Sequence, residues 1–180
     1  TDIYMYMSYG VSVYYAESME TIADNIKEVK PSMFASVPRL LEKVYDKILA
    51  KGNELTGVKR KLFFGAIEFG LQYDPMVKLG LLDSMKLAVY RKLIFSKWKE
   101  ALGGKIRLIT SGSAALQPRL SRVFWAAGIP ISEGYGLTET SPVISVSQVD
   151  PIDFQVGCVG TVLDCLELKI AEDGEICVKG

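Results

Sequence analysis

The stretch ISEGYGLTETSP combines glycines, hydroxyl groups and carboxylates between two hydrophobic segments. Within it, Thr138 carries a hydroxyl of the kind that bonds phosphate oxygens, and Glu139 carries a hard oxygen ligand suited to magnesium. Gly134 and Gly136 allow a flat ring to approach the backbone closely, and Tyr135 offers an aromatic face. These residue types together describe one wall of a nucleotide site.

A second loop of small residues, GSAAL, precedes this stretch in the sequence. Its residues Gly112, Ser113 and Ala114 would let a flat ring approach the backbone from the other side. Both loops follow predicted strands, and a predicted helix separates them. Because ligands bind at the carboxyl ends of strands in open parallel sheets, we expect the two loops to lie side by side.

Each of these residues also has an ordinary structural explanation. The GSAAL loop is a good tight turn between a strand and a helix. Thr138 suits a helix N-cap, Glu139 suits an exposed surface position, and Tyr135 suits the edge of a core with its hydroxyl satisfied. The order and spacing of the whole set, rather than any one member, favour the nucleotide site.

The segments that would position the loops follow an α/β pattern. Residues 10–16 and 32–37 are rich in β-branched or hydrophobic residues and predict buried strands. Between them, an amphipathic stripe predicts a helix from Ser18 that ends at Pro31, and Pro38 opens another helix. This alternation predicts a parallel βαβ sheet with flanking helices, because parallel strands need a crossover connection.

The middle of the chain continues this pattern after a helical interruption. Residues 57–102 are predicted to be mostly helical. A strand at 105–111 then leads into the GSAAL loop, and a helix runs from Pro118 to Gly128 before the strand at 129–136.

The last third has a different character. Residues 166–171 and 175–179 predict two strands, and Asp173-Gly174 between them is a signal for a type I′ hairpin. An antiparallel hairpin after an α/β body predicts a second sheet or subdomain.

Composition excludes several classes of function. Nearly half of the 180 residues are apolar, which disfavours disorder, and the formal charge is zero, which gives no electrostatic footprint for a nucleic-acid partner. The Lys59-Arg60-Lys61 run suits a solvated helix face. The chain holds no histidine, which excludes His-dependent nucleophiles and His-ligated zinc within it.

The three cysteines lack CxxC spacing, and their odd number favours reduced, buried thiols in a cytoplasmic protein. We find no signal peptide and no apolar run of transmembrane length. Peripheral membrane association stays open, although no helix reads as strongly basic and amphipathic.

Several ordered motifs resemble one family of enzymes. GYGLTET resembles the YGxTE signature of adenylate-forming enzymes, and GSAAL stands where their adenine-contacting loop stands. The stretches 14–39, 36–45, 92–116 and 173–180 closely resemble AMP-forming long-chain fatty acid–CoA ligases. The resemblance covers essentially the whole chain.

This resemblance implies a reaction in two steps. A fatty acid carboxylate attacks the α-phosphate of ATP, with Mg²⁺ bound, and coenzyme A then displaces AMP from the acyl group. It implies that Thr138 contacts phosphate, that Glu139 ligates magnesium, and that both take part in catalysis. It implies an adenine pocket formed by Gly112, Ser113, Ala114, Glu133, Gly134, Tyr135 and Gly136.

The resemblance also implies that residues 1–180 form the central part of a large AMP-binding N-terminal domain. About 1–150 would be its α/β portion, and about 155–180 would begin a β-rich subdomain. In the family, a phosphate loop precedes this region, and a ribose-binding Asp and a C-terminal lysine domain follow it. The abrupt chain ends fit such a piece, so we expect these residues alone to form no acyl-CoA.

Some positions depart from the family pattern, and two alternatives stay open. Ser111 stands where a second glycine is common, and Cys165 stands where a glycine is frequent. These departures bear on specificity more than on adenylate chemistry. The chain could belong to an adenylating enzyme for another carboxylic acid, or to a nucleotide-binding scaffold that has lost its chemistry.

Overall fold

The computed structural model describes residues 6, 8–150 and 154–180 of the chain. Its helical segments are α2 (Ile22–Val29), α3 (Pro38–Asn53), α4 (Gly57–Gln72), α5 (Leu81–Tyr90), the π-helical η1 (Arg91–Phe95), α6 (Ser96–Ala101), α7 (Pro118–Ala126) and the 3₁₀ turn η2 (Thr138–Thr140). Its strands are β1 (Met33–Ser36), β2 (Leu108–Ser111), β3 (Ile131–Gly136), β4 (Val143–Val146), β5 (Thr161–Val162), β6 (Glu167–Ile170) and β7 (Ile176–Lys179).

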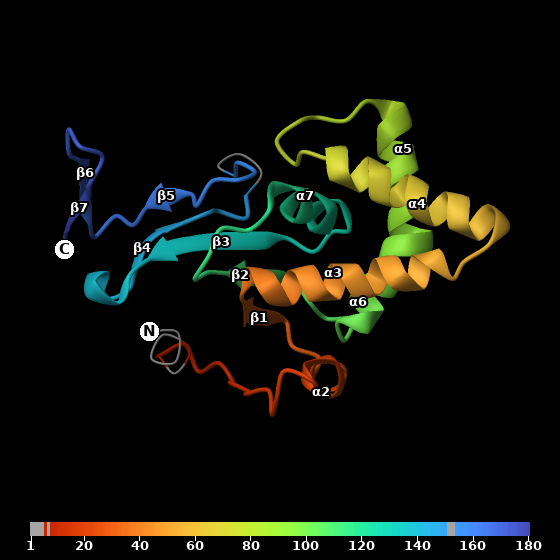
Figure 1. Ribbon diagram of the computed structural model, residues 1–180, viewed down its shortest axis with the longest axis horizontal. Helices are drawn as coiled ribbons and strands as arrows, with labels where there is room; N and C mark the ends of the chain where they lie inside the picture. The colour runs from red at the N-terminus through yellow and green to blue at the C-terminus, as the bar shows by residue number, and fades with distance from the viewer. Residues whose placement is uncertain (1–5, 7, 151–153) are drawn as a thin grey trace.

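Five strands form one sheet in the order β1-β2-β3-β4-β5. Strands β1, β2 and β3 are parallel, whereas β4 and β5 add antiparallel to the far edge. Strands β6 and β7 form a separate antiparallel hairpin (Figure 1). The predicted fold class, a parallel βαβ sheet followed by a hairpin of a second sheet, is confirmed.

Two prolines begin the helices that flank the parallel strands. Pro38 and Pro118 occupy the first turns of α3 and α7, where a missing N–H costs nothing and a fixed φ suits the helix. On α3, Leu41 and Tyr45 turn toward the core, as their spacing predicts. On α7 the hydrophobic stripe is completely buried, which anchors the helix that follows the GSAAL loop.

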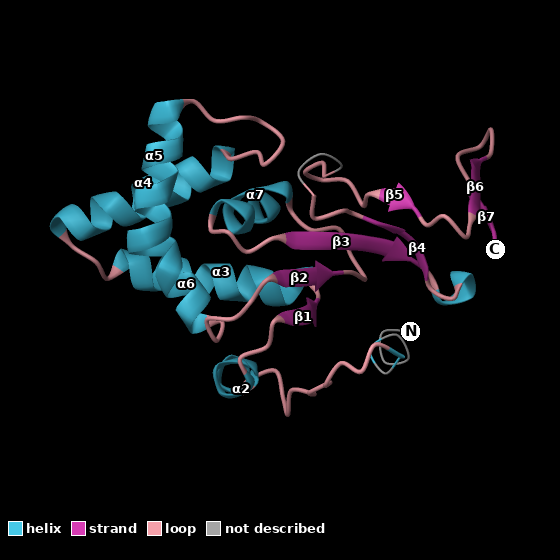
Figure 2. Ribbon diagram, turned by 180° about the vertical axis from the view of Figure 1, so that it is seen from behind, coloured by secondary structure: helices cyan, strands magenta, loops and turns pink. Residues whose placement is uncertain are grey.

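The helical segment α4–α6 packs around one tryptophan. The ring of Trp98 meets the rings of Phe95, Phe124 and Tyr45 edge to face, at centroid distances of 5.2, 5.7 and 6.3 Å. In addition, the Arg91 Nε donates a hydrogen bond of 2.8 Å to a carbonyl at the end of α7. These contacts hold the helical segment against α3 and α7, and Figure 2 shows these helices from behind.

One predicted strand is wrong. Residues 11–16 form no regular strand, and Tyr14 and Tyr15 are 69% and 73% exposed. A β-branched and aromatic sequence becomes a strand only when a neighbour completes its hydrogen bonds. In the described part of the chain, β1 pairs with β2 alone, so residues 11–16 have no ladder.

Two smaller expectations are also corrected. Cys158, Cys165 and Cys177 are exposed rather than buried, because they lie on the thin C-terminal strands and turns. The β6–β7 turn is not type I′, since Gly174 has positive φ but Asp173 does not. It instead fits a three-residue loop with glycine at the left-handed position. Among the described helices, none is long and apolar enough to cross a membrane.

Candidate nucleotide site

Parallel pairing of β2 with β3 brings the two small-residue loops to one edge of the sheet. The register aligns Ser111 with Glu133, the last pair between these two strands. Strand β2 ends at Ser111, whereas β3 continues to Gly136 before the turn η2. A β-carbon built on Gly112 would lie 3.9 Å from the Gly134 carbonyl oxygen. The two loops therefore lie side by side, in the arrangement that the strand order predicts.

The GSAAL loop presents backbone rather than bulky side chains at this edge. Ser113, Ala114 and Ala115 are exposed, and Gly112 is half-buried. Ser113 adopts a left-handed conformation, with φ of 69°. Non-glycine residues rarely adopt positive φ, and such strain concentrates at ligand-binding sites.

The two glycines of β3 differ in the space that a side chain would find at each position. A β-carbon on Gly134 would meet only the Ser145 carbonyl oxygen at 3.8 Å, an ordinary contact. A β-carbon on Gly136 would collide with the backbone of Pro142 and Val143, where the chain returns into β4. Gly136 is thus required by packing, while Gly134 leaves room beside Gly112. Tyr135 between them is half-buried.

The turn η2 carries the predicted phosphate and metal residues. Thr138 and Glu139 are both exposed, and neither side chain makes a hydrogen bond or ion pair to any described residue. The capping role falls to Thr140, whose Oγ1 accepts a 3.0 Å hydrogen bond from the Leu137 N–H. The N-cap explanation of Thr138 is therefore wrong, and its hydroxyl is available to a ligand.

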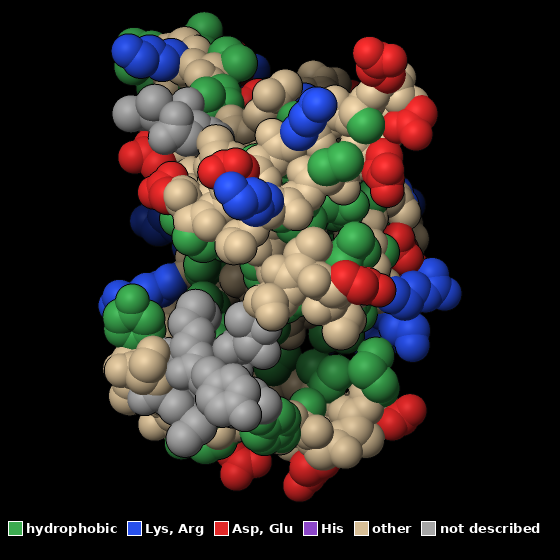
Figure 3. Space-filling view, turned by 90° about the vertical axis from the view of Figure 1, so that its left-hand side faces the viewer, with side chains coloured by type: hydrophobic (Ala, Val, Ile, Leu, Met, Phe, Trp, Pro, Cys, Tyr) green, Lys and Arg blue, Asp and Glu red, His purple; other side chains and the backbone are tan. Residues whose placement is uncertain are grey.

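Figure 1 shows η2 projecting beyond the end of β3, at the same end of the molecule as the loops. Figure 3 looks onto this end, where exposed hydrophobic side chains lie among acidic and basic ones. No group of three or more potential metal ligands occurs among the described residues. A lone Glu139 carboxylate nevertheless fits Mg²⁺, which binds through one or two carboxylates together with substrate phosphates and water.

Glu133 is the most unusual of the predicted residues. It is only 5% exposed, and its Oε1 has no hydrogen-bond partner in the described structure. Burial raises the pKa of this carboxyl, and a hydrogen bond from the Leu116 backbone N–H partly opposes that rise. Because Leu116 ends the GSAAL loop, the Glu133 side chain connects β3 to that loop.

Sequence reasoning missed the contribution of Ser111. Its hydroxyl is also buried without a partner among described residues, on the strand next to Glu133 and in register with it. Side chains aligned in register on parallel strands point to the same face of the sheet. Two neighbouring polar atoms without partners offer hydrogen bonds to a polar ligand or to water. The signal was its place immediately before Gly112, at the end of a strand.

A cavity of about 360 Å³ lies elsewhere, between the end of α4 and the start of α5. Its lining includes Phe69, Tyr73, Leu79 and Lys86, none of which lies near the small-residue loops. The candidate site is instead an open edge formed by backbone and by η2. The assignment of this site rests on the residues that the fold brings together there, rather than on an enclosed cavity.

A model described as AMP-binding enzyme matches residues 1–180. The chain is 35% identical over 173 residues to the long-chain-fatty-acid–CoA ligase FadD15 of Mycobacterium bovis (strain ATCC BAA-935 / AF2122/97), covering 94% of this chain and 28% of that protein. It is 31% identical over 191 residues to the peroxisomal long chain acyl-CoA synthetase 6 of Arabidopsis thaliana, covering 98% and 26%. The chain thus spans little more than a quarter of these relatives.

Among solved structures, the chain resembles o-succinylbenzoate CoA synthetase (MenE) from Bacillus subtilis in complex with the acyl-adenylate intermediate OSB-AMP. The TM-score is 0.55 at 18% sequence identity, covering 99% of this chain and 29% of that one. At this identity the likeness shows a shared fold.

Proposed function

The chain belongs to the AMP-binding enzyme family, and from that premise we propose that it supplies the adenylate site of a fatty acid–CoA ligase. The complete enzyme would activate a long-chain fatty acid with ATP and Mg²⁺ and pass the acyl group to coenzyme A. The observation that carries the proposal is that Gly112 and Gly134 lie side by side, at 3.9 Å from a β-carbon built on Gly112 to the Gly134 carbonyl oxygen. Thr138 and Glu139 follow in η2 with exposed side chains.

The two small-residue loops would hold the adenine ring. Gly112 and Gly134 would let a flat ring approach the backbone closely, because neither has a side chain to keep the ring away. Ser113 and Ala114 form the rim of the same loop, and the Tyr135 ring lies one residue beyond Gly134. Buried polar atoms of Ser111 and Glu133 lie behind this edge and would fix its shape.

The turn η2 would hold the phosphates. The Thr138 hydroxyl can donate a hydrogen bond to a phosphate oxygen, and Glu139 can bind magnesium through one carboxylate. Bound magnesium would neutralise developing negative charge on the phosphates. The Thr140 hydroxyl makes hydrogen bonds to the Leu137 backbone, which stabilise the η2 turn. The turn in its place orients Thr138 and Glu139.

The chemistry balances in two displacements. In the first, a carboxylate oxygen of the fatty acid attacks the α-phosphorus, and pyrophosphate leaves with the bonding electrons. In the second, the thiolate sulfur of coenzyme A attacks the acyl carbon, and AMP leaves as its phosphate anion. This chain would hold the AMP portion through both steps.

The names of the relatives favour a long-chain fatty acid over another acid. The three exposed cysteines form no disulfide, which supports a reducing compartment such as the cytoplasm. An adenylating enzyme for a different carboxylic acid would keep the same loops, so acid preference must be measured.

The test is ATP–pyrophosphate exchange by the full-length protein across acids of increasing chain length. A Glu139→Gln variant should lower exchange by orders of magnitude, because a charge-bearing metal ligand contributes several kcal/mol at the transition state. Glu28→Gln, at an exposed position on α2, is the matched control and should leave exchange unchanged. Exchange only with short or aromatic acids would favour the other adenylating enzymes, and exchange with none would favour a scaffold.

A further inference from the structure

The end of the GSAAL loop is joined to α3 by a hydrogen bond between residues that lie 75 positions apart in the sequence. The Gln117 Nε2 donates to the Glu42 Oε1 at 2.7 Å, and both residues are half-buried. Gln117 is the N-cap residue of α7 and follows Leu116 directly, whereas Glu42 lies in the second turn of α3. This bond therefore connects the loop to a helix from a distant part of the chain.

Neighbouring side chains fix the orientation of both partners. The Arg119 Nε donates to the Gln117 Oε1 at 2.7 Å, and the same guanidinium lies 5.8 Å from the centre of the Tyr45 ring. The Arg39 Nη1 donates to the second oxygen of Glu42 at 3.0 Å, and the Glu42 side chain is only 21% exposed. A hydrogen bond to a carboxylate that is largely removed from water is stronger than one at the surface.

Few other hydrogen bonds hold the loop. At its start, the Gly112 N–H donates to the Ser36 carbonyl at 3.3 Å. The backbone of residues 113–115 makes no hydrogen bond to any residue that the structure describes. At its end, the Leu116 N–H donates to the Glu133 carboxyl. Hydrogen bonds therefore hold this loop at its two ends, and the loop between them depends on how well the ends are fixed.

The conformation of the loop needs this restraint. Ser113 has a φ of 69°, and a non-glycine residue keeps such a conformation only where the surroundings impose it. The side chains of residues 113–115 are exposed and contribute little packing. The bonds of Gly112 and Leu116 both lead to strands of the sheet, whereas the bond of Gln117 ties the loop to a helix.

We infer that Glu42 is a positioning residue for nucleotide binding, and that it acts through Gln117 to hold the GSAAL loop in the conformation that receives the adenine ring. The inference rests on the proposed function, because it takes this loop as one wall of the adenylate site. Without the bond, the loop would relax and would have to be ordered again whenever nucleotide binds. That cost applies equally to the bound substrate and to the transition state, so it raises the KM for ATP and leaves kcat unchanged.

The test measures ATP–pyrophosphate exchange by the full-length protein. Glu42→Ala and Gln117→Ala should each raise the KM for ATP about tenfold at unchanged kcat, within the range for a hydrogen bond to a charged group. The double variant should be no worse than either single variant, because both substitutions remove the same bond. Glu42→Gln keeps an oxygen that can accept from Gln117, so it should restore most of the affinity. Arg39→Gln removes only the ion pair and should keep the wild-type KM.

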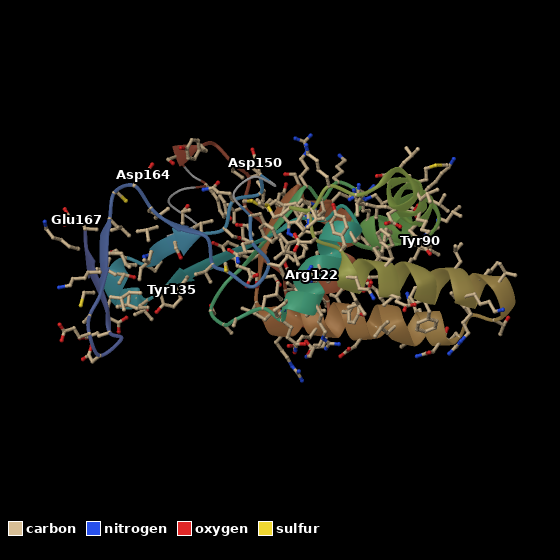
Figure 4. All side chains as sticks on the ribbon, turned by 90° about the horizontal axis from the view of Figure 1, so that it is seen from above. Tyr90, Arg122, Tyr135, Asp150, Asp164 and Glu167 are labelled. Carbon is tan, nitrogen blue, oxygen red and sulfur yellow. The ribbon has the colours of Figure 1, made fainter. Side chains whose placement is uncertain are left out.

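A matched control removes a different contact of α7. The Arg122 Nη1 donates to the Tyr73 carbonyl at 3.0 Å and to the Asp74 Oδ2 at 3.3 Å. In Figure 4, Arg122 lies well away from Tyr135 of the candidate site, nearer the helical end of the molecule. Asp74→Asn should therefore lower the unfolding temperature and leave the KM for ATP unchanged. The same pattern in Glu42→Ala would overturn the inference, because the bond would then serve the fold alone.

Calorimetric binding of AMP, measured without an acid or coenzyme A, separates this inference from the proposed ligase. Weaker AMP binding by Glu42→Ala and near-normal binding by Glu42→Gln would support the inference, even if the wild type exchanged pyrophosphate with no acid. Equal AMP affinity in the wild type and Glu42→Ala would overturn the inference alone. A wild type that binds no AMP would overturn the inference together with the proposed function.

Discussion

Ser111 and Glu133 are paired in register across the parallel strands β2 and β3, and each keeps a buried polar atom without a partner among the described residues. Such groups are costly to bury, because they lose hydrogen bonds to water without gaining new ones. Ser111 precedes the GSAAL loop, and Glu133 precedes Gly134 on β3, so the pair lies beside the candidate nucleotide site. The Ser111–Glu133 pair therefore affects both the stability of the sheet and the shape of the site.

Glu133→Gln should change how stability depends on pH. The pKa of Glu133 is raised by burial, so the folded state binds its proton more tightly than the unfolded state. Stability from this group is therefore full below the unfolded pKa and is lost as pH rises through the folded pKa. The variant keeps an acceptor for the Leu116 N–H but cannot ionise.

Chemical denaturation across a pH series checks this expectation. The wild-type protein should lose stability over the window from about 4.5 upward to the raised pKa, and Glu133→Gln should not. Glu28→Gln, at an exposed carboxylate, should follow the wild type. Parallel curves for the wild type and Glu133→Gln would mean that the carboxyl is not desolvated in solution.

Gly112→Ala should affect nucleotide binding more than folding. The added β-carbon would make only an ordinary 3.9 Å contact with the Gly134 oxygen, so we expect a stability change within about 0.5 kcal/mol. The same methyl group would stand where a flat ring approaches the backbone. We expect the KM for ATP in pyrophosphate exchange to rise about tenfold, roughly 1.4 kcal/mol. An unchanged KM would place the adenine ring elsewhere.

Gly136→Ala should behave in the opposite way. Its β-carbon would collide with the backbone of Pro142, which cannot move aside without disturbing the β3–β4 turn. We expect a loss of about 1–3 kcal/mol in the free energy of unfolding, in the range of other overpacking substitutions. Thermal unfolding beside Gly112→Ala provides the comparison. Equal melting temperatures for the two variants would contradict the packing explanation of Gly136.

The order of elements around the site could be predicted from local patterns. Pro38, Pro118 and the hydrophobic periodicities identified the crossover helices, and crossovers imply parallel strands. The adjacency of the two loops followed from that order alone. The strand predicted for this part of the chain was wrong at residues 11–16, because strand formation depends on a partner strand that their own sequence does not specify.

The burial of Glu133 could not be predicted for a similar reason. A glutamate is usually exposed, and its burial here depends on β2 on one side and β4 on the other. The sequence analysis did not predict strand β4. Ser147, the residue after that strand, accepts a hydrogen bond of 2.6 Å from the Glu133 N–H through its hydroxyl oxygen. The cysteines were likewise assigned from residue type, while their exposure follows from their places: Cys158 and Cys165 lie in connecting segments, and Cys177 lies on the two-stranded hairpin.

Thr138 and Thr140 lie in the same turn, and we expect substitution of Thr138 to lower activity and substitution of Thr140 to lower stability. Thr140→Val removes the hydroxyl that bonds Leu137 and Pro142, and we expect a loss of about 1 kcal/mol in unfolding free energy. Thr138→Val removes an exposed hydroxyl with no described protein partner, so stability should hold while pyrophosphate exchange falls.

A charge-assisted hydrogen bond to phosphate is worth about 1.5–3 kcal/mol, so the fall in exchange for Thr138→Val should be at least about tenfold. Thr138→Ser keeps the hydroxyl and should restore most of the activity, which a purely structural role would not require. Thr140→Ser should likewise recover stability. If Thr138→Val melts lower and Thr138→Ser recovers only the melting temperature, Thr138 serves the turn, and the phosphate contact must come from another residue.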